Sequence, residues 1–274
     1  MGSAHVGAQS VNFRCDSTGH DTVGTGDTAG SGSGSGSGSS NVNTSGAKVL
    51  SPQQGSSNHT QINNALKGGG TVYLNAGTYV ISDTIILNSG NTLTGDAGAI
   101  IKLADNANWP KYKNMIEGIG VSNVRVTGFE VDGNRANNTS SDGASTACGK
   151  YYYTMIYFKN SSGIEVDNMY LHHNWNDILK FSACDNVKFH HNTVRQPGHD
   201  VVYNNYIRIY CNSGVRPDGT QNIYIYNNDI ARDEGAGGYA GIEIQGDSIV
   251  YICNNNIHDT KGGSIVDLSG GSAK

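Results

Sequence analysis

The segment NVRVTGFEVDGN at residues 123–134 decides the fold, because its pattern returns along the chain. Apolar residues recur at the same offsets, with Asn, Gly or His between them, in GIEVDNMYLHHN at 163–174, NVKFHHNTVR at 186–195, NIYIYNNDIA at 222–231 and IVYICNNNIH at 249–258. Alternating apolar residues indicate short strands with one buried face. Asn and Gly tolerate left-handed backbone angles and therefore suit tight turns between such strands. The recurrence of this unit indicates a repeat architecture.

A second series of alternating segments lies between these repeats: MIYF at 155–158, ILKF at 178–181, YIRI at 206–209, GIEI at 241–244 and IVDL at 265–268. Together the two series describe a unit of about 23 residues with loop insertions of variable length. Short strands that stack on their own copies are typical of a parallel β-helix, whose crossovers are almost always right-handed. The sequence therefore predicts an all-β, single-stranded, right-handed parallel β-helix solenoid. A β-sandwich would show more closely spaced hairpins, and a propeller a longer period.

The composition excludes several classes of protein. Charged residues make up 15% of the 274 residues and the net charge is −5, which argues against a nucleic-acid-binding domain. No apolar run approaches the ~18 residues that a membrane-spanning helix needs. The 38 Gly residues disfavour a helical bundle. The five cysteines are odd in number and widely spaced, so we expect buried free thiols rather than a disulfide framework.

Two regions of different composition divide the chain. Residues 1–46 are mostly Gly, Ser and Thr, which predicts a disordered, flexible leader or linker. Residues 47–274 are expected to form the β-helix domain. Thr60 is a candidate N-cap for a short helix over residues 61–66 that ends at the Gly run 68–70. We expect this helix to cap the N-terminal end of the solenoid.

A family resemblance follows from other segments. The run GGGTVYLNAGTYVI at 68–81 resembles the opening of pectate-lyase-like β-helix proteins. The segments NTLTGDAGAIIKL at 91–103, GFEVDGN at 128–134, YYTMIYF at 152–158 and GHD at 198–200 are similar to the archaeal disaggregatases. That resemblance implies an enzyme that degrades methanochondroitin, the uronic-acid-containing matrix of aggregating methanogens, and so disperses cell aggregates. The resemblance implies no particular catalytic residues. The candidate site therefore follows from the repeat pattern of this sequence alone.

Stacked coils place equivalent residues in columns along a solenoid. In the second series, alternation points the apolar residues inward, namely Ile156/Phe158, Leu179/Phe181, Ile207/Ile209, Ile242/Ile244 and Val266/Leu268. The residue between each pair then faces outward, which gives the column Tyr157, Lys180, Arg208, Glu243 and Asp267. Such a column suits an acidic polysaccharide laid across the coils. A solvated face whose charges satisfy one another would show the same pattern.

The loops that enter this series carry the candidate catalytic groups. Glycoside hydrolysis needs two carboxyl groups beside the scissile bond, and Asp177 and Asp200 are candidates for them, with His199 as a proton carrier. Elimination by a lyase needs instead a base and a cation that neutralises the uronate. Lys180 or Arg208 would serve that reaction, with Ca²⁺ held by carboxylates.

Other residues near the column are candidates for substrate binding. They are Tyr157, His173, Trp175, Glu243 and Asp267. The adjacent pairs His172-His173 and His190-His191 do not predict a metal site, because neighbouring residues on a strand point to opposite faces. We expect a structural role for His190-His191.

The sequence predicts an extracellular or cell-surface enzyme that degrades an acidic polysaccharide, either a glycoside hydrolase or a lyase, with hydrolysis favoured. No secretory signal is visible at the start of the chain. The alternative is a non-catalytic β-helix: a fibre, an adhesin, a virion spike or a self-assembling subunit. Residues 270–274 follow a strand without a polar cap, so we expect a homotrimer or stacking through the C-terminal coil.

Overall fold

A computed structural model describes most of the chain from residue 42 onward. The described residues are 42–107, 109, 113–138, 154–174, 177–195, 201–203, 206–208, 213–231, 240–245, 249–258, 264–269 and 272–273. Most of the predicted leader lies outside these residues, as do Trp175, His199 and Asp200. Within the described residues, no helix is long and apolar enough to cross a membrane.

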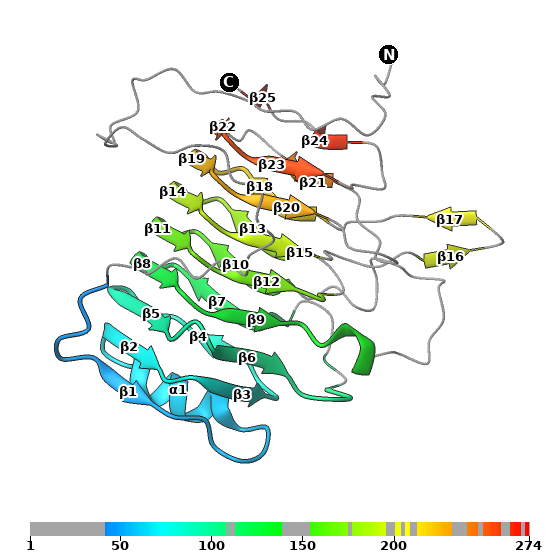
Figure 1. The fold of residues 1–274 in the computed structure, drawn as a ribbon. Helices are drawn as coiled ribbons and strands as arrows, with labels where there is room; N and C mark the ends of the chain where they lie inside the picture. Colours follow the sequence, from blue (N-terminus) through cyan, green and yellow to red (C-terminus); the bar gives the residue numbers. More distant parts are fainter. Residues whose placement is uncertain are drawn as a thin grey trace, which may run out of the picture.

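Three parallel sheets run along the molecule (Figure 1). Sheet A contains, in spatial order, β1 (Lys48–Leu50), β2 (Gly70–Leu74), β5 (Asn91–Gly95), β8 (Ser122–Thr127), β11 (Ser162–Asp167), β14 (Asp185–His190), β19 (Gln221–Tyr226), β22 (Ile249–Cys253) and β25 (Ser272–Ala273). Sheet B contains β3 (Gly77–Ile81), β6 (Ala99–Leu103), β9 (Glu130–Asp132), β12 (Tyr170–His172), β15 (Thr193–Arg195), β20 (Asp229–Ala231) and β23 (Asn256–His258). Sheet C contains β4 (Ile85–Ile86), β7 (Ile116–Ile119), β10 (Ile156–Lys159), β13 (Leu179–Ser182), β18 (Ser213–Asp218), β21 (Ala240–Gln245) and β24 (Ser264–Ser269).

Each coil passes through sheet C, then sheet A, then sheet B before it begins the next coil. Each segment of the first sequence series forms a strand of sheet A and the next strand of sheet B, and four of the five segments of the second series form strands of sheet C. The predicted parallel β-helix is therefore confirmed.

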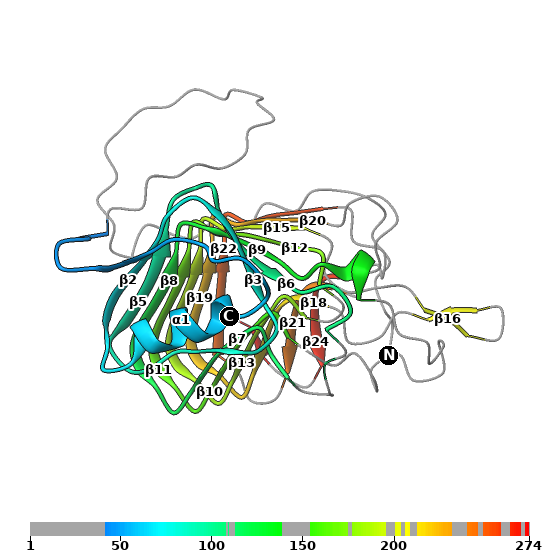
Figure 2. The same ribbon diagram turned by 90° about the horizontal axis from the view of Figure 1, so that it is seen from below.

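The helix α1 (Asn58–Leu66) lies across the N-terminal end of the solenoid (Figure 2). Its apolar residues Ile62 and Leu66 are fully buried against the first coil. The predicted capping helix is therefore confirmed, but its predicted N-cap is wrong. Ser57 occupies that position without a side-chain cap bond, and Thr60 lies inside the helix. A short 3₁₀ helix, η1 (Arg135–Asn137), follows β9.

The interior is filled by apolar side chains from all three sheets. In sheet C the predicted inward residues are fully buried on three strands: Ile156, Phe158, Leu179, Phe181, Ile242 and Ile244. The rings of Phe158 and Phe181 stack with centroids 5.9 Å apart. Parallel register places apolar residues of successive coils above one another. The inward side chains of each coil therefore pack against those of the coil before it.

The segment YIRI at 206–209 does not join sheet C, so its predicted place there is wrong. β17 (Tyr206–Arg208) pairs antiparallel with β16 (Val201–Tyr203), and Arg208 lies opposite Val201. Figure 1 shows this hairpin to one side of the stacked sheets. β18 takes the place in sheet C and pairs with β13 and β21. The hairpin thus extends one loop between sheets B and C.

The turns from sheet A to sheet B are alike in successive coils. In the five coils from β8 onward each turn consists of two residues, and the first of them has a positive φ: Gly128, Asn168, His191, Asn227 and Asn254. The second residue is buried, and in three coils it is an asparagine: Asn192, Asn228 and Asn255. Asn192 donates its side-chain N–H to Asn228 Oδ1 at 3.0 Å, and Asn228 donates likewise to Asn255 at 2.8 Å. These asparagines form a buried ladder along the solenoid axis.

Two cysteines differ in state. Cys184 is a buried free thiol, as expected, and burial raises its pKa. Cys253, on β22, is disulfide-bonded, so the expectation of free thiols throughout is wrong.

Candidate active site

Equivalent register positions on the strands of sheet C form one continuous column. Register places Tyr157 between Glu117 on β7 and Lys180 on β13, and places Lys180 beside Arg216 on β18. Val215 pairs with Ile242, so Glu243 follows in the same column, and Glu243 pairs with Asp267. The register keeps Tyr157, Lys180, Glu243 and Asp267 in one column, as the repeat pattern predicts, and their role in substrate binding stays a prediction.

Arg216, and not Arg208, occupies the register position beside Lys180. The sequence contains a signal that finds it. Tyr157 precedes Gly163 by six residues, Lys180 precedes Asn186 by six, and Arg216 precedes Asn222 by six. Pro217 conceals this strand, because proline is disfavoured inside a sheet.

A row of buried polar residues lies immediately before the strands of sheet C. Asn114, Thr154 and Asp177 occupy equivalent positions in successive coils, with 6%, 3% and 0% of their surfaces exposed. The Thr154 backbone N–H donates to Asn114 Oδ1 at 3.1 Å. The Met155 N–H donates to the Asp177 carbonyl at 3.1 Å. Asp177 is therefore held at the corner where a loop from sheet B enters sheet C.

Asn174 fixes this corner from the other end of its short loop. Its side-chain N–H donates to the Asp177 carbonyl at 2.8 Å, and the side chain of Asn174 is fully buried. Asp177 begins the segment that continues through β13 to the outward Lys180. Asp177 and Lys180 therefore lie on the same coil, Asp177 buried and Lys180 outward, with Tyr157 on the coil beside them.

The connections from sheet B to sheet C vary widely in length. They span residues 82–84, 104–115, 133–155, 173–178, 196–212, 232–239 and 259–263. The candidates Trp175, His199 and Asp200 belong to these connections and lie outside the described residues. Their roles, like that of Arg208, remain predictions from the sequence.

His173 lies at the end of sheet B rather than in the sheet C column. It follows β12 with φ of 55°, and 40% of its side chain is exposed. Because of this left-handed turn, His172 and His173 contact each other through their Nδ1 atoms instead of pointing to opposite faces. The expectation drawn from strand alternation is wrong for this pair.

The outer face of sheet A carries charged groups that satisfy one another. Arg125 donates from Nε and Nη2 to the fully buried Asp167 at 2.8 and 2.7 Å, and it lies 3.5 Å from Glu165. This pairing raises the pKa of Arg125. His190 Nε2 lies 3.0 Å from Glu165 Oε1, and that hydrogen bond lowers the pKa of Glu165. This face has the paired charges of a structural network.

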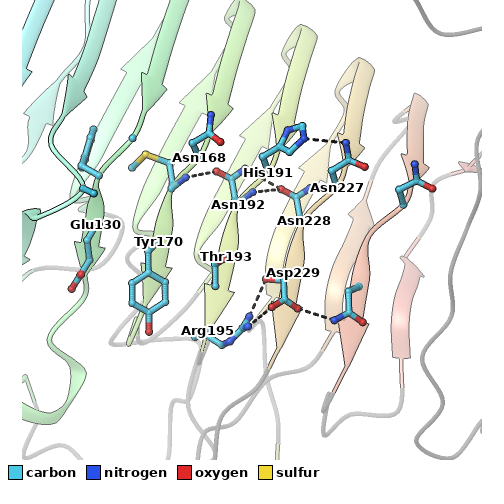
Figure 3. A pocket seen from close by; sticks show the side chains of 16 residues that line it. Glu130, Asn168, Tyr170, His191, Asn192, Thr193, Arg195, Asn227, Asn228 and Asp229 are labelled. Carbon is cyan, nitrogen blue, oxygen red and sulfur yellow. Dashed lines mark hydrogen bonds and ion pairs between the residues drawn. The ribbon is translucent and has the colours of Figure 1, made fainter. Parts of the chain in front are cut away.

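A groove with a volume of about 890 Å³ crosses the turns from sheet A to sheet B and the outer face of sheet B (Figure 3). Tyr170, which is 38% exposed, and Thr193 line it. Arg195 forms an ion pair with Asp229 within the groove. Asp177 and Lys180 do not line this groove, so it is a candidate binding surface rather than the candidate catalytic centre.

Comparison with known families agrees with this architecture. The model of the glycosyl hydrolases family 28 matches residues 39–265. The chain belongs to glycosyl hydrolase family 28. It is therefore a glycoside hydrolase with a pectate-lyase-like right-handed β-helix. A search of curated proteins found no match.

Solved structures show the same fold as this family 28 chain. The polygalacturonase of Erwinia carotovora is 17% identical, with a TM-score of 0.61, over 76% of this chain and 61% of that one. The endo-xylogalacturonan hydrolase of Aspergillus tubingensis is 16% identical, with a TM-score of 0.53, over 74% and 57%. PfbA, a surface adhesin of Streptococcus pneumoniae, is 16% identical, with a TM-score of 0.56, over 72% and 52%. The chain thus spans between half and two thirds of the length of these proteins.

Proposed function

We propose that this family 28 hydrolase cleaves glycosidic bonds in a uronic-acid-containing polysaccharide that lies along sheet C. The observation that carries the proposal is the arrangement of Asp177 and Lys180 on one coil, within a column that continues to Arg216. A row of cations beside a carboxyl group suits a substrate that carries one carboxylate per sugar. Proteins of the same fold include a polygalacturonase and an endo-xylogalacturonan hydrolase.

The chemistry assigns different tasks to these groups. Hydrolysis of a glycosidic bond requires a proton donor to the leaving oxygen and a second carboxylate that acts as base or nucleophile. We propose Asp177 as one member of the pair and Asp200 as the other, with His199 carrying protons. Lys180 and Arg216 would bind uronate carboxylates on neighbouring sugars through charge-assisted hydrogen bonds. Participation of Ca²⁺ stays a prediction of the lyase alternative.

The natural substrate and location extend this proposal. A methanochondroitin-like matrix would present the required uronic acids, and its cleavage would disperse cell aggregates. An extracellular or cell-surface location is supported by the disulfide bond of Cys253, because disulfides persist mainly in oxidising compartments. The homotrimer and the stacking of C-terminal coils remain predictions, which the molecular mass in solution would test.

A product assay tests the reaction. Purified protein is incubated with polygalacturonate and, separately, with a chondroitin-type glycan, while reducing ends and the absorbance of unsaturated uronates are measured. Hydrolysis predicts new reducing ends without that absorbance. Both signals together would identify a lyase and overturn the proposed chemistry. Absence of both on every uronic-acid glycan would overturn the enzyme function.

Lys180 tests the role assigned to the column. Lys180→Ala should raise KM for polygalacturonate by about tenfold or more, because one charge-assisted hydrogen bond contributes ~1.5–3 kcal/mol. Lys188→Ala is the matched control, since Lys188 is an exposed outward lysine of sheet A. It should leave KM unchanged. Equal effects of the two variants would contradict binding along sheet C.

One observation favours a second function. A surface adhesin, PfbA, has the same fold, and the groove on sheet B offers Tyr170 as an exposed ring on which sugars can stack. Non-catalytic glycan binding is therefore the alternative. It predicts retention of the protein on an immobilised glycan without release of reducing ends.

A further inference from the structure

We propose that Asp132, His172 and His173 bind a first-row divalent transition-metal ion such as Zn²⁺. One ligand atom from each residue lies within 4.8 Å of the others. The two Nδ1 atoms contact each other, and each lies 3.8 Å from Asp132 Oδ1. This inference goes beyond the proposed hydrolysis and does not depend on it.

The tautomer of His172 points to a cation. Its Nε2 lies 3.0 Å from Glu130 Oε1, and a carboxylate at that distance requires the proton to be on Nε2. When Nε2 carries the only ring proton, Nδ1 of His172 presents a lone pair toward His173. A carboxylate that holds the far nitrogen of a histidine in this way is the usual outer partner of a metal-binding imidazole.

Asp132 supplies a carboxylate oxygen, Oδ1, that can bind a metal ion through a second lone pair. Its Oδ1 accepts a hydrogen bond from the Asn134 backbone N–H at 2.7 Å, while its Oδ2 lies 3.3 Å from Lys102 Nζ. Lys102 therefore pairs with Oδ2 and not with Oδ1, the oxygen that faces the two histidines. Two carboxylates, Glu130 and Asp132, lie beside the two imidazoles, so a divalent ion would be electrostatically favoured.

Burial and ligand type define the class of ion. The side chains of His172 and Asp132 are 7% and 15% exposed, whereas that of His173 is 40% exposed. His173 thus leaves a path for entry and a position for water. Two imidazoles and one carboxylate suit Zn²⁺ or a similar ion, whereas Ca²⁺ prefers oxygen ligands alone. Binding at ~2.0–2.1 Å requires the two imidazole rings to move apart.

A second cluster provides a comparison. Glu165, Asp167 and His190 also lie within 4.8 Å of one another. There the guanidinium of Arg125 already occupies both oxygens of Asp167 and faces Glu165. A metal ion would have to displace this cation. We therefore assign the metal to the first cluster and not to the second.

Zn²⁺ titration of the EDTA-treated full chain by calorimetry tests the assignment. His173→Asn is the test variant and His191→Asn its matched control, because both histidines have φ of 55° and Asn accepts that backbone conformation. We expect one Zn²⁺ per wild-type chain, at least tenfold weaker binding in His173→Asn, and unchanged binding in His191→Asn. Circular dichroism confirms that each variant is folded.

Co²⁺ provides a second readout, since its visible spectrum reports imidazole coordination. Wild type and His191→Asn should give the same spectrum, which His173→Asn should lose. Failure of the wild type to bind Zn²⁺ would overturn the proposal. Equal affinity of wild type and His173→Asn would also overturn it, because the ion would then lie elsewhere. Glu130→Gln should weaken binding about 10–100-fold if the outer carboxylate acts as described.

Discussion

The turns between sheets A and B differ from the connections between sheets B and C in length and in how strictly they repeat from coil to coil. The A-to-B turns keep two residues in five coils, and their asparagines hydrogen-bond to one another. The B-to-C connections range in length from residues 82–84 to residues 133–155. We infer that polar residues in the uniform turns stabilise the fold, whereas polar residues beside the variable connections can serve in catalysis or binding.

The largest effect is expected in the asparagine ladder. Asn228→Leu removes the hydrogen bonds of the Asn228 side chain with the backbone N–H and side chain of Asn192, with the Phe189 carbonyl and with Asn255 Oδ1, all in the interior. Unsatisfied buried groups cost ~1–3 kcal/mol each, so we expect a loss of about 3–5 kcal/mol in the free energy of unfolding. Urea denaturation measures it. Asn227→Gly is the control, because Asn227 is exposed and Gly accepts its positive φ.

A smaller effect, of opposite sign, is expected in the turns from sheet C to sheet A. Ala183 has φ of 50°, where other coils place Gly120, Asn160 and Gly219. A left-handed conformation costs an alanine ~1–2 kcal/mol. Ala183→Gly should therefore stabilise the protein by up to about 1 kcal/mol and raise Tm. Ala231→Gly, inside a strand of sheet B, should lower Tm; an equal rise in both variants would contradict the strain argument.

The smallest effect concerns acid stability. The pKa of Glu165 is lowered below 4.5 by its hydrogen bond to His190. The ionised group therefore stabilises the fold above about pH 4.5, and this contribution is lost as pH falls through the folded-state pKa. Glu165→Gln should flatten the fall in Tm below pH 4.5 by an amount equivalent to less than ~1 kcal/mol, since the group is partly exposed. An unchanged slope between pH 5 and 3 would contradict this contribution.

Much of the fold could be predicted from the sequence, because strand alternation and turn asparagines repeat in it. The column through Tyr157, Lys180, Glu243 and Asp267 follows from that alternation. Arg208 was misplaced because an apolar alternating segment can form a hairpin in a loop as readily as a strand of the solenoid. The true neighbour, Arg216, was recognisable only from its constant spacing to the next turn.

The details of the candidate site were less accessible. Burial of Asp177 depends on contacts between successive coils, including those around Asn174. The convergence of His172 and His173 depends on one backbone angle, which sequence alternation does not reveal. Loop residues lack repeats, so their positions cannot be inferred from equivalent coils. Sequence thus locates the surface on which chemistry occurs better than it identifies each participating atom.

The rate at which Asp177→Asn releases reducing ends from polygalacturonate tests the central claim most directly. The substitution preserves size and removes the proton-donating or basic carboxyl group, so we expect at least a ~100-fold loss of kcat. Asp185→Asn, on the exposed face of sheet A, should retain wild-type kcat. Urea denaturation of both variants shows whether the fold is preserved. A folded Asp177→Asn with wild-type kcat would contradict the account.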